Sequence, residues 1–216
     1  MIRKTLSATQ DATYCIELPN ATMRAMPTPM GTGFFVSADG WFLTAAHVVM
    51  DPMTKAARAD IDAAWLTKEG RAPEVFGAMC QYAEIVECMP EIDIALLKVD
   101  WEKNCNKASL KGRSGFPYIR PSVRELEEAE PVYSFGYPLS EASIEYHDAQ
   151  VTIGGQALCP RVTSAIIASH LDQSEMFVPG VRPRVYVLDK ALNYGNSGGP
   201  ILSVETGHVH ALCSRS

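Results

Sequence analysis

The 216-residue sequence has no apolar run that approaches the length of a transmembrane helix, so a helical membrane span is not expected. Its basic first residues have no apolar stretch behind them, and residues 1–11 therefore do not resemble a secretory signal. Positive charge is also scarce: 19 Lys and Arg against 25 Asp and Glu give a formal net charge of −6. Such a chain offers no basic surface for phosphates, and we predict a protein that binds neither nucleic acid nor membrane.

Cysteine spacing of the kind that holds a metal is absent as well. The six cysteines show no CxxC pair and no cysteine–histidine cluster, so we expect no metal site and no cofactor. His208 and His210 share one face of a predicted strand, but two imidazoles alone do not make a metal site. We interpret most of the cysteines as reduced, buried, small apolar residues, and we predict a cytoplasmic location.

Helix-period segments are few and short, and no fixed repeat is evident. Hydrophobic residues make up 47% and charged residues 20%, which is ordinary for a soluble globular protein. Short β-branched and aromatic runs dominate instead, as in residues 12–18, 31–37 and 132–138. An Asp39-Gly40 turn between residues 31–37 and the run 41–44 predicts a β-hairpin. The composition and these runs predict an all-β chain.

One serine near the end of the chain lies in an unusually glycine-rich loop. Ser197 stands between Gly195 and Gly198-Gly199, and this loop separates the predicted strands 184–188 and 201–204. Glycine permits backbone angles that a β-carbon would forbid and leaves space beside the hydroxyl. A serine presented in this way can attack a carbonyl, with the N–H groups of Gly195 and Ser197 directed at the oxyanion that forms. An ordinary glycine-rich hairpin remains the alternative for this motif alone.

Two further residues could support such a serine, although each alone favours a structural reading. His47 follows Ala45-Ala46 at the end of the run 41–44, where a histidine is more often a packed or surface residue. Asp93 precedes the apolar strand 94–99, where an aspartate commonly caps a turn. Their functional reading therefore depends on the motifs taken together.

Taken together, the motifs resemble the trypsin-like serine peptidases, and within them the bacterial HtrA-like branch without a PDZ domain. The resemblance covers about residues 12–213, with His47, Asp93 and Ser197 in the family's order. It implies two packed antiparallel β-barrels with the active site between them. The motifs that carry it are residues 31–36 (GTGFFV), 43–49 (LTAAHVV), 93–98 (DIALLK), 135–138 (FGYP) and 189–200 (DKALNYGNSGGP).

The resemblance also implies a division of the chain and a role for each matching residue. Residues 1–100 would form the barrel that carries His47 and Asp93, residues 101–131 a linker, and residues 132–216 the barrel that carries Ser197. Ser197 would be the nucleophile, His47 its general base and Asp93 the residue that orients the imidazole. Because the chain stops at Ser216, we expect either a truncated or shortened chain with an incomplete second barrel, or a second barrel whose missing part comes from a partner or another domain.

The same resemblance gives an expectation for specificity. Ala191, six residues before the serine, would lie at the base of the primary pocket and would attract no cationic side chain. We therefore predict cleavage after apolar residues. Ser214, Arg215 and Ser216 would form another wall of the pocket. Asp189 and Asn193 match the HtrA-like pattern and are interpreted as residues that stabilise the loop.

The predicted function is thus a serine endopeptidase with a polypeptide substrate, under the control of an activating or regulatory protein partner. Two alternatives stay open. The first is a catalytically silent peptide-binding module of the same fold, in which the short C-terminal end leaves Ser197 misaligned. The second is an esterase or acyl transferase that uses the same three residues.

Overall fold

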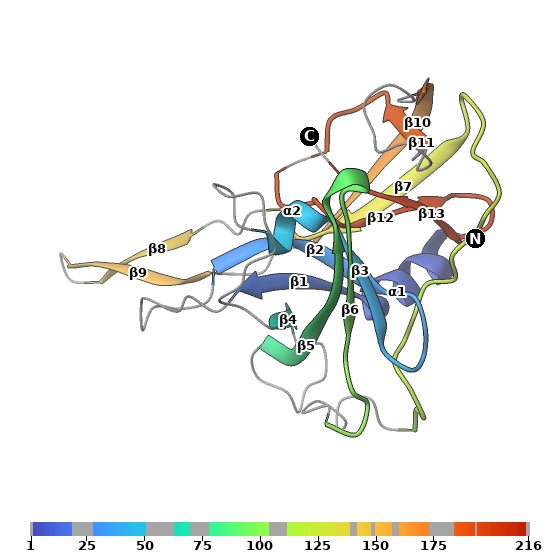
Figure 1. Cartoon of the computed structure of the whole chain (residues 1–216). Coiled ribbons are helices and arrows are strands. Elements are labelled where there is room, and N and C mark those ends of the chain that lie inside the picture. Colours follow the sequence, from blue (N-terminus) through green and yellow to red (C-terminus); the bar gives the residue numbers. More distant parts are fainter. Residues whose placement is uncertain are drawn as a thin grey trace.

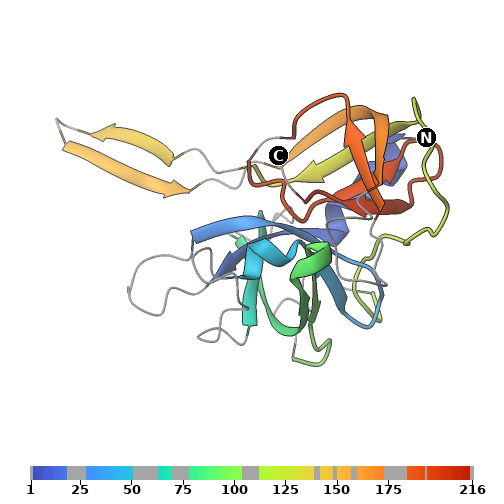
Figure 2. The same cartoon turned by 45° about the horizontal axis from the view of Figure 1, so that its top comes forward.

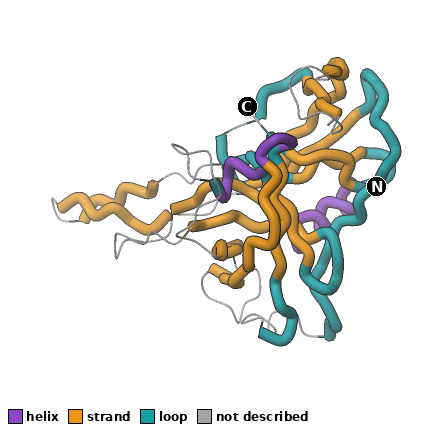
Figure 3. The backbone as a smooth tube through the Cα atoms, in the orientation of Figure 1, coloured by secondary structure: helices purple, strands orange, loops and turns teal. Residues whose placement is uncertain are grey.

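The computed structural model is a mostly β molecule in which two curled antiparallel sheets pack together, with a long hairpin projecting from one side (Figures 1 and 3). The predicted all-β architecture of two packed antiparallel barrels is confirmed. The structure describes residues 2–18, 28–50, 63–69, 78–103, 112–138, 142–147, 150–156, 160–172, 184–192 and 194–214.

The first sheet closes into a six-stranded barrel in the order β1-β2-β3-β6-β5-β4. Alternate residues of β3 and β6 are buried, as expected for strands with one face on a core. The core is aromatic: Tyr14, Phe35 and Phe42 pack edge to face at centroid distances of 5.0–6.5 Å. The strands are β1 (Thr13–Leu18), β2 (Thr28–Phe35), β3 (Trp41–Thr44), β4 (Ala63–Glu69), β5 (Ala78–Met89) and β6 (Ile94–Lys98).

The predicted hairpin around Asp39-Gly40 is part of this barrel. β2 pairs with β3 on either side of the turn, and the N–H of Val36 donates to the carbonyl of Trp41 over 2.9 Å. Gly40 has a φ of +99°, and a Cβ there would lie 2.1 Å from the Val99 carbonyl oxygen. The turn therefore requires glycine at this position.

The second sheet has five described strands in the order β11-β10-β7-β12-β13. Its core contains Leu126, Val132, Ile167 and Ile201. The strands are β7 (Pro131–Gly136), β10 (Arg161–Asp172), β11 (Arg184–Leu188), β12 (Pro200–Ser203) and β13 (Val209–Leu212).

β8 (Ala142–His147) and β9 (Gln150–Gln156) form a separate two-stranded sheet. In Figures 1 and 2 this hairpin extends away from both larger sheets. It interrupts the connection between two neighbouring strands, because Gly136 at the end of β7 pairs with Arg161 at the start of β10. The hairpin is thus inserted into the connection between β7 and β10, whose paired residues Gly136 and Arg161 lie next to each other in the sheet.

Three short helical elements complete the described chain: α1 (Ile2–Ala12), α2 (Ala46–Val49) and the 3₁₀ turn η1 (Pro90–Ile92). The sequence did not predict α1. Leu6 of this helix packs against two apolar clusters, and Thr9 Oγ1 lies 3.2 Å from the Tyr133 hydroxyl of β7. Helix α1 thereby covers the junction of the two sheets. None of these helices has the length and apolarity needed to cross a membrane.

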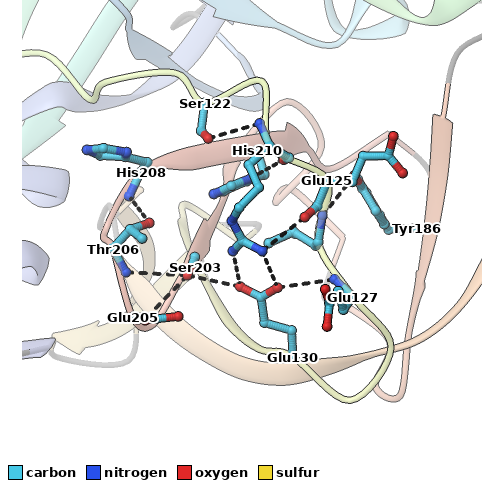
Figure 4. Close-up of polar contacts among 12 residues, drawn as sticks. Ser122, Glu125, Glu127, Glu130, Tyr186, Ser203, Glu205, Thr206, His208 and His210 are labelled. Carbon is cyan, nitrogen blue, oxygen red and sulfur yellow. Dashed lines mark hydrogen bonds and ion pairs between the residues drawn. The ribbon is translucent and has the colours of Figure 1, made fainter.

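The segment between β6 and β7, expected to be a linker, contacts both sheets over residues 115–130. Phe116 stacks on Phe35 of the first barrel at 4.4 Å, and the N–H of Ile119 donates to the Phe35 carbonyl. Further along, the N–H of Ser122 donates to the carbonyl of Val209 in β13 over 2.9 Å. Figure 4 shows the next part of the segment held against the β12–β13 hairpin by a polar network.

Candidate active site

His47 lies in the four-residue helix α2, which begins where β3 of the first barrel ends. Ala45 and Ala46, directly before it, are fully buried, and Val48 and Val49 pack into the barrel core. The histidine is thus the exposed member of an otherwise buried turn, with 42% of its side chain accessible. Its imidazole is anchored by its neighbours and remains open to solvent.

Asp93 is held in an unusual backbone conformation between η1 and β6. Its φ of 54° and ψ of 43° are left-handed, a region in which aspartate is among the few non-glycine residues that occur. The N–H of Asp93 donates to the carbonyl of Pro90 and closes the 3₁₀ turn. The expected turn role of Asp93 is therefore real, and it coexists with a contact to His47.

The Asp93 carboxylate lies against the imidazole of His47. Nδ1 of His47 is 2.9 Å from Oδ2 and 3.0 Å from Oδ1, and the backbone N–H of His47 donates to Oδ1 over 3.0 Å. Ser214 Oγ donates to Oδ2 over 2.5 Å. Because an ionised carboxylate only accepts hydrogen bonds, the ring proton belongs on Nδ1 and Nε2 carries the free lone pair.

The ionised form of Asp93 is the favoured one. Burial of the carboxyl acts to raise its pKa, but the hydrogen bonds from His47 and Ser214 outweigh burial and hold the pKa below its usual value. Asp93 therefore stays negatively charged at neutral pH.

The serine loop is fixed by backbone geometry that requires glycine. Gly195 and Gly198 have φ values of +94° and +81°. A Cβ on Gly198 would lie 2.2 Å from both the Thr32 carbonyl oxygen and Thr44 Oγ1, and 2.7 Å from the backbone nitrogen of Ala45. The loop thus packs closely against the end of β3, two residues before His47, and leaves Ser197 half-buried.

The residues around Ser214 also link the serine loop to the His47–Asp93 pair. The N–H of Gly198 donates to the carbonyl of Cys213 over 2.6 Å, and the N–H of Cys213 donates to the carbonyl of Gly199 over 2.8 Å. Ser214, the next residue, donates to Asp93. Within the described chain no hydrogen bond joins the His47 ring to Ser197 Oγ, and all the described bonds of that ring go to Asp93.

Only some of the expected pocket residues are among those that the structure describes. Ala191 is exposed, whereas Arg215, Ser216 and the expected loop residue Asn193 lie outside the described residues. Ser214 was expected as a pocket wall, and its hydroxyl is bonded to Asp93. Asp189 accepts a hydrogen bond from the N–H of Ile166 over 2.9 Å, a contact that stabilises the end of β11.

Sequence reasoning missed two contacts of this site. It gave no role to Thr32, whose N–H donates to the Ser197 carbonyl over 2.8 Å, and it did not foresee the bond from Ser214 to Asp93. The only sequence signal for Thr32 was its position inside the GTGFF motif. No group of three or more His, Cys, Asp or Glu that could hold a metal occurs among the described residues.

The chain is similar to a known family of protein domains and to several known proteins. A family model for the trypsin-like peptidase domain matches residues 31–212. "Probable periplasmic serine endoprotease DegP-like" of Ectopseudomonas mendocina is 29% identical over 86% of this chain and 29% of its own length. Serine protease HTRA1 of Xenopus laevis is 28% identical over 84% of this chain and 30% of its own length. The chain thus spans under a third of the length of these two curated relatives.

The fold is shared with a solved structure as well. The crystal structure of Deg5 superposes with a TM-score of 0.65 at 17% identity, covering 99% of this chain and 84% of that one.

The cytoplasmic location expected from the sequence is wrong, because the Ectopseudomonas relative is named as periplasmic. The expectation rested on the first residues and on cysteine spacing, and neither reports a compartment directly. Cys15 and Cys213 are free and buried, and burial raises the pKa of the Cys213 thiol to about 11. Such protonated, buried thiols react little, so the pairing state of these cysteines does not identify the compartment.

Proposed function

Because this chain belongs to the trypsin-like peptidase domain family, we propose that it is a serine endopeptidase that uses Ser197, His47 and Asp93. The observation that carries the proposal is the bond between Nδ1 of His47 and the ionised Asp93 carboxylate, next to a glycine-shaped serine loop. With the ring proton on Nδ1 directed at Asp93, the neutral imidazole of His47 has a free lone pair on Nε2, as a general base requires.

In the proposed reaction, Nε2 of His47 takes the hydroxyl proton of Ser197 while Oγ attacks the scissile carbonyl carbon. Asp93 holds the resulting imidazolium in place and offsets its charge. The carbon–nitrogen bond then breaks as Nε2 returns the proton to the leaving amine, which gives an acyl-enzyme. Water, deprotonated by the same nitrogen, attacks the ester and releases Ser197.

The oxyanion of each tetrahedral intermediate would be held by the N–H groups of Gly195 and Ser197. Fixed donors aimed at developing charge are usually the largest contribution to such catalysis, and removing one costs about 10²–10³ in turnover. No described hydrogen bond yet joins His47 to Ser197, but catalytic hydrogen bonds often tighten only when substrate binds.

We assign the substrate class as polypeptides, with an apolar residue before the cleaved bond. Ala191 supports this assignment, because the expected pocket base carries no charge. A peptide library cleaved mainly after Lys or Arg would overturn it. A periplasmic location accompanies the proposal by analogy with the named relative, and cell fractionation tests it.

Fluorophosphonate labelling of the purified protein tests the function, with the labelled peptide mapped. We expect one adduct on Ser197 that disappears in Ser197→Ala. Ser164→Ala, which alters an exposed serine on β10, is the matched control and should label like the unaltered protein. A label that persists in Ser197→Ala would rule the proposal out, and a folded protein that does not label on its own would favour the silent module described next.

A catalytically silent peptide-binding module is the second candidate. It is favoured by the absence of a described hydrogen bond between the His47 ring and Ser197 Oγ. Saturable peptide binding by calorimetry, with neither labelling nor cleavage, would select this alternative. The expected activating or regulatory protein partner stays a prediction, and restoration of labelling by such a partner would distinguish a restrained enzyme from a silent module.

A further inference from the structure

Thr32 of β2 is fully buried and stands at the junction of the two sheets. Its hydroxyl donates to the carbonyl of Gly195 over 2.8 Å and accepts from the N–H of Tyr137 over 2.9 Å. Its N–H donates to the carbonyl of Ser197 over 2.8 Å, and its carbonyl accepts from Thr44 Oγ1 over 2.7 Å. Every polar group of Thr32 is therefore engaged, and two of the bonds go to the serine loop.

These two bonds fix the peptide groups on either side of the Ser197 N–H. The Gly195 carbonyl belongs to the peptide plane that joins Gly195 to Asn196, and the Ser197 carbonyl belongs to the plane that joins Ser197 to Gly198. Because each peptide unit is planar, anchoring both carbonyls restricts the rotation of the peptide unit that lies between them. That unit joins Asn196 to Ser197 and carries the Ser197 N–H.

Glycine makes such anchoring necessary. Gly195 has a φ of +94°, and without a side chain it can adopt several orientations at little cost. A buried hydroxyl that donates to its carbonyl favours one of these orientations, because rotation would leave both partners unsatisfied away from water. We propose that Thr32 is the positioning residue of the oxyanion loop, an inference that rests on the proposed function.

The Thr32 hydroxyl also joins the two halves of the molecule. Thr32 belongs to the first barrel, whereas Tyr137 follows β7 of the second sheet and Gly195 follows β11. A Cβ on Gly136 would lie 2.3 Å from Asn196 Oδ1, so the end of β7 and the serine loop are in close contact. The hydroxyl thus aligns the serine loop with both sheets, a role distinct from simple packing.

The test compares Thr32→Val, which keeps the shape but removes the hydroxyl, with Thr32→Ser, which keeps the hydroxyl. We expect Thr32→Val to lower kcat on a peptide ester about 10- to 100-fold, because a displaced oxyanion donor weakens only transition-state binding. KM should change less than about twofold on the same ground. Thr32→Ser should restore kcat to within about threefold of the unaltered protein, since the donor remains.

Thr13→Val is the matched control, because Thr13 Oγ1 is also buried and donates to a carbonyl, that of Thr9, over 2.7 Å. It should lower the melting temperature much as Thr32→Val does while leaving kcat unchanged. Equal loss of kcat in both variants, wild-type kcat in Thr32→Val, or failure of Thr32→Ser to restore kcat would overturn the proposal. If Thr32→Val does not fold, Thr32→Cys replaces it, because a thiol is a weak donor of similar size.

Amide hydrogen exchange of the peptide that covers residues 194–199 gives a readout without turnover. Thr32→Val should accelerate exchange there, whereas Thr13→Val should not. If the unaltered protein neither labels nor turns over ester, the proposed function fails, while exchange still decides whether Thr32 positions the loop. Unchanged exchange in Thr32→Val would refute the positioning role even in an active enzyme.

Discussion

At the scale of single residues, the hydroxyl of Ser214 is one of the donors that hold the pKa of Asp93 below its usual value. In Ser214→Ala the carboxylate loses a donor at 2.5 Å, so its pKa should rise towards the usual value. Asp93 should then become protonated at a higher pH than in the unaltered protein, because the carboxylate has lost one of the donors that stabilise its charged form. At neutral pH we expect kcat/KM to fall up to about tenfold, in keeping with one hydrogen bond to a charged group.

A carboxyl ¹³C NMR titration of Asp93, together with kcat/KM on a small ester at pH 7, checks this prediction. Ser122→Ala serves as its control, because Ser122 lies on the far segment between β6 and β7 and its Oγ contacts only a local backbone N–H among the described residues. An Asp93 titration that is unshifted in Ser214→Ala would contradict the assigned role of the hydroxyl.

The sequence carries unequal information about these residues. The order of His47 and Asp93 in the motifs led to the expectation that they interact, and the structure brings them to 2.9 Å. Thr32 and Gly195 are 163 residues apart, and Ser214 and Asp93 are 121 apart. Such contacts depend on how the two sheets pack, and a lone threonine or serine in a short motif does not reveal them.

At the scale of elements, several strands were predicted well, whereas the first helix and the β8–β9 hairpin were not. The runs predicted at 41–44 and 184–188 are β3 and β11 with the same bounds. Helix α1 is polar and short, and such helices are marginal in isolation. It is stabilised by Leu6 and Thr9 against the body of the protein, and these tertiary contacts have no local pattern in the sequence.

The β8–β9 hairpin should be dispensable for folding. Its strands pair with each other in a sheet of their own, and the connection it interrupts joins Gly136 to Arg161 across one pair of neighbouring strands. Replacing residues 141–158 by a six-residue Gly-Ser linker should therefore leave the melting temperature nearly unchanged. Calorimetry checks this, with the same linker in place of residues 116–121 as a disruptive control. A large loss of stability on replacing the hairpin would show that it supports the β7–β10 pair.

At the scale of the whole molecule, the segment between β6 and β7, which also contacts the first barrel, is fixed against the second sheet by specific bonds. Arg124 forms two hydrogen bonds to the Glu130 carboxylate, at 2.5 and 3.0 Å, and Ser203 Oγ of β12 donates to the same carboxylate over 3.2 Å (Figure 4). Nδ1 of His210 in β13 donates to the Arg124 carbonyl over 2.8 Å. The β12–β13 hairpin held by these bonds leads directly into Ser214, which donates to Asp93. The network is therefore linked to Asp93 through this hairpin and Ser214.

Glu130 makes the stability of this arrangement dependent on pH. The Arg124 guanidinium, by its hydrogen bonds, holds the pKa of the Glu130 carboxyl below its usual value of 4.5. A carboxyl with a depressed pKa in the folded state stabilises the protein above its unfolded pKa, and this contribution is lost as pH falls through the folded value. Glu130→Gln should therefore lower the melting temperature by a few degrees at pH 7, and the gap should narrow below about pH 4.

Thermal unfolding from pH 3 to pH 8 measures that gap. Other carboxyls with lowered pKa values, such as Asp39 and Asp93, are present in both proteins, so their contributions cancel in the difference. Glu128→Gln, which alters an exposed carboxylate of the same segment, is the control and should show a small gap at every pH. A Glu130→Gln gap that stayed constant down to pH 3 would mean that the carboxylate contributes through shape and neutral hydrogen bonds, and that its charge does not hold this segment against β12.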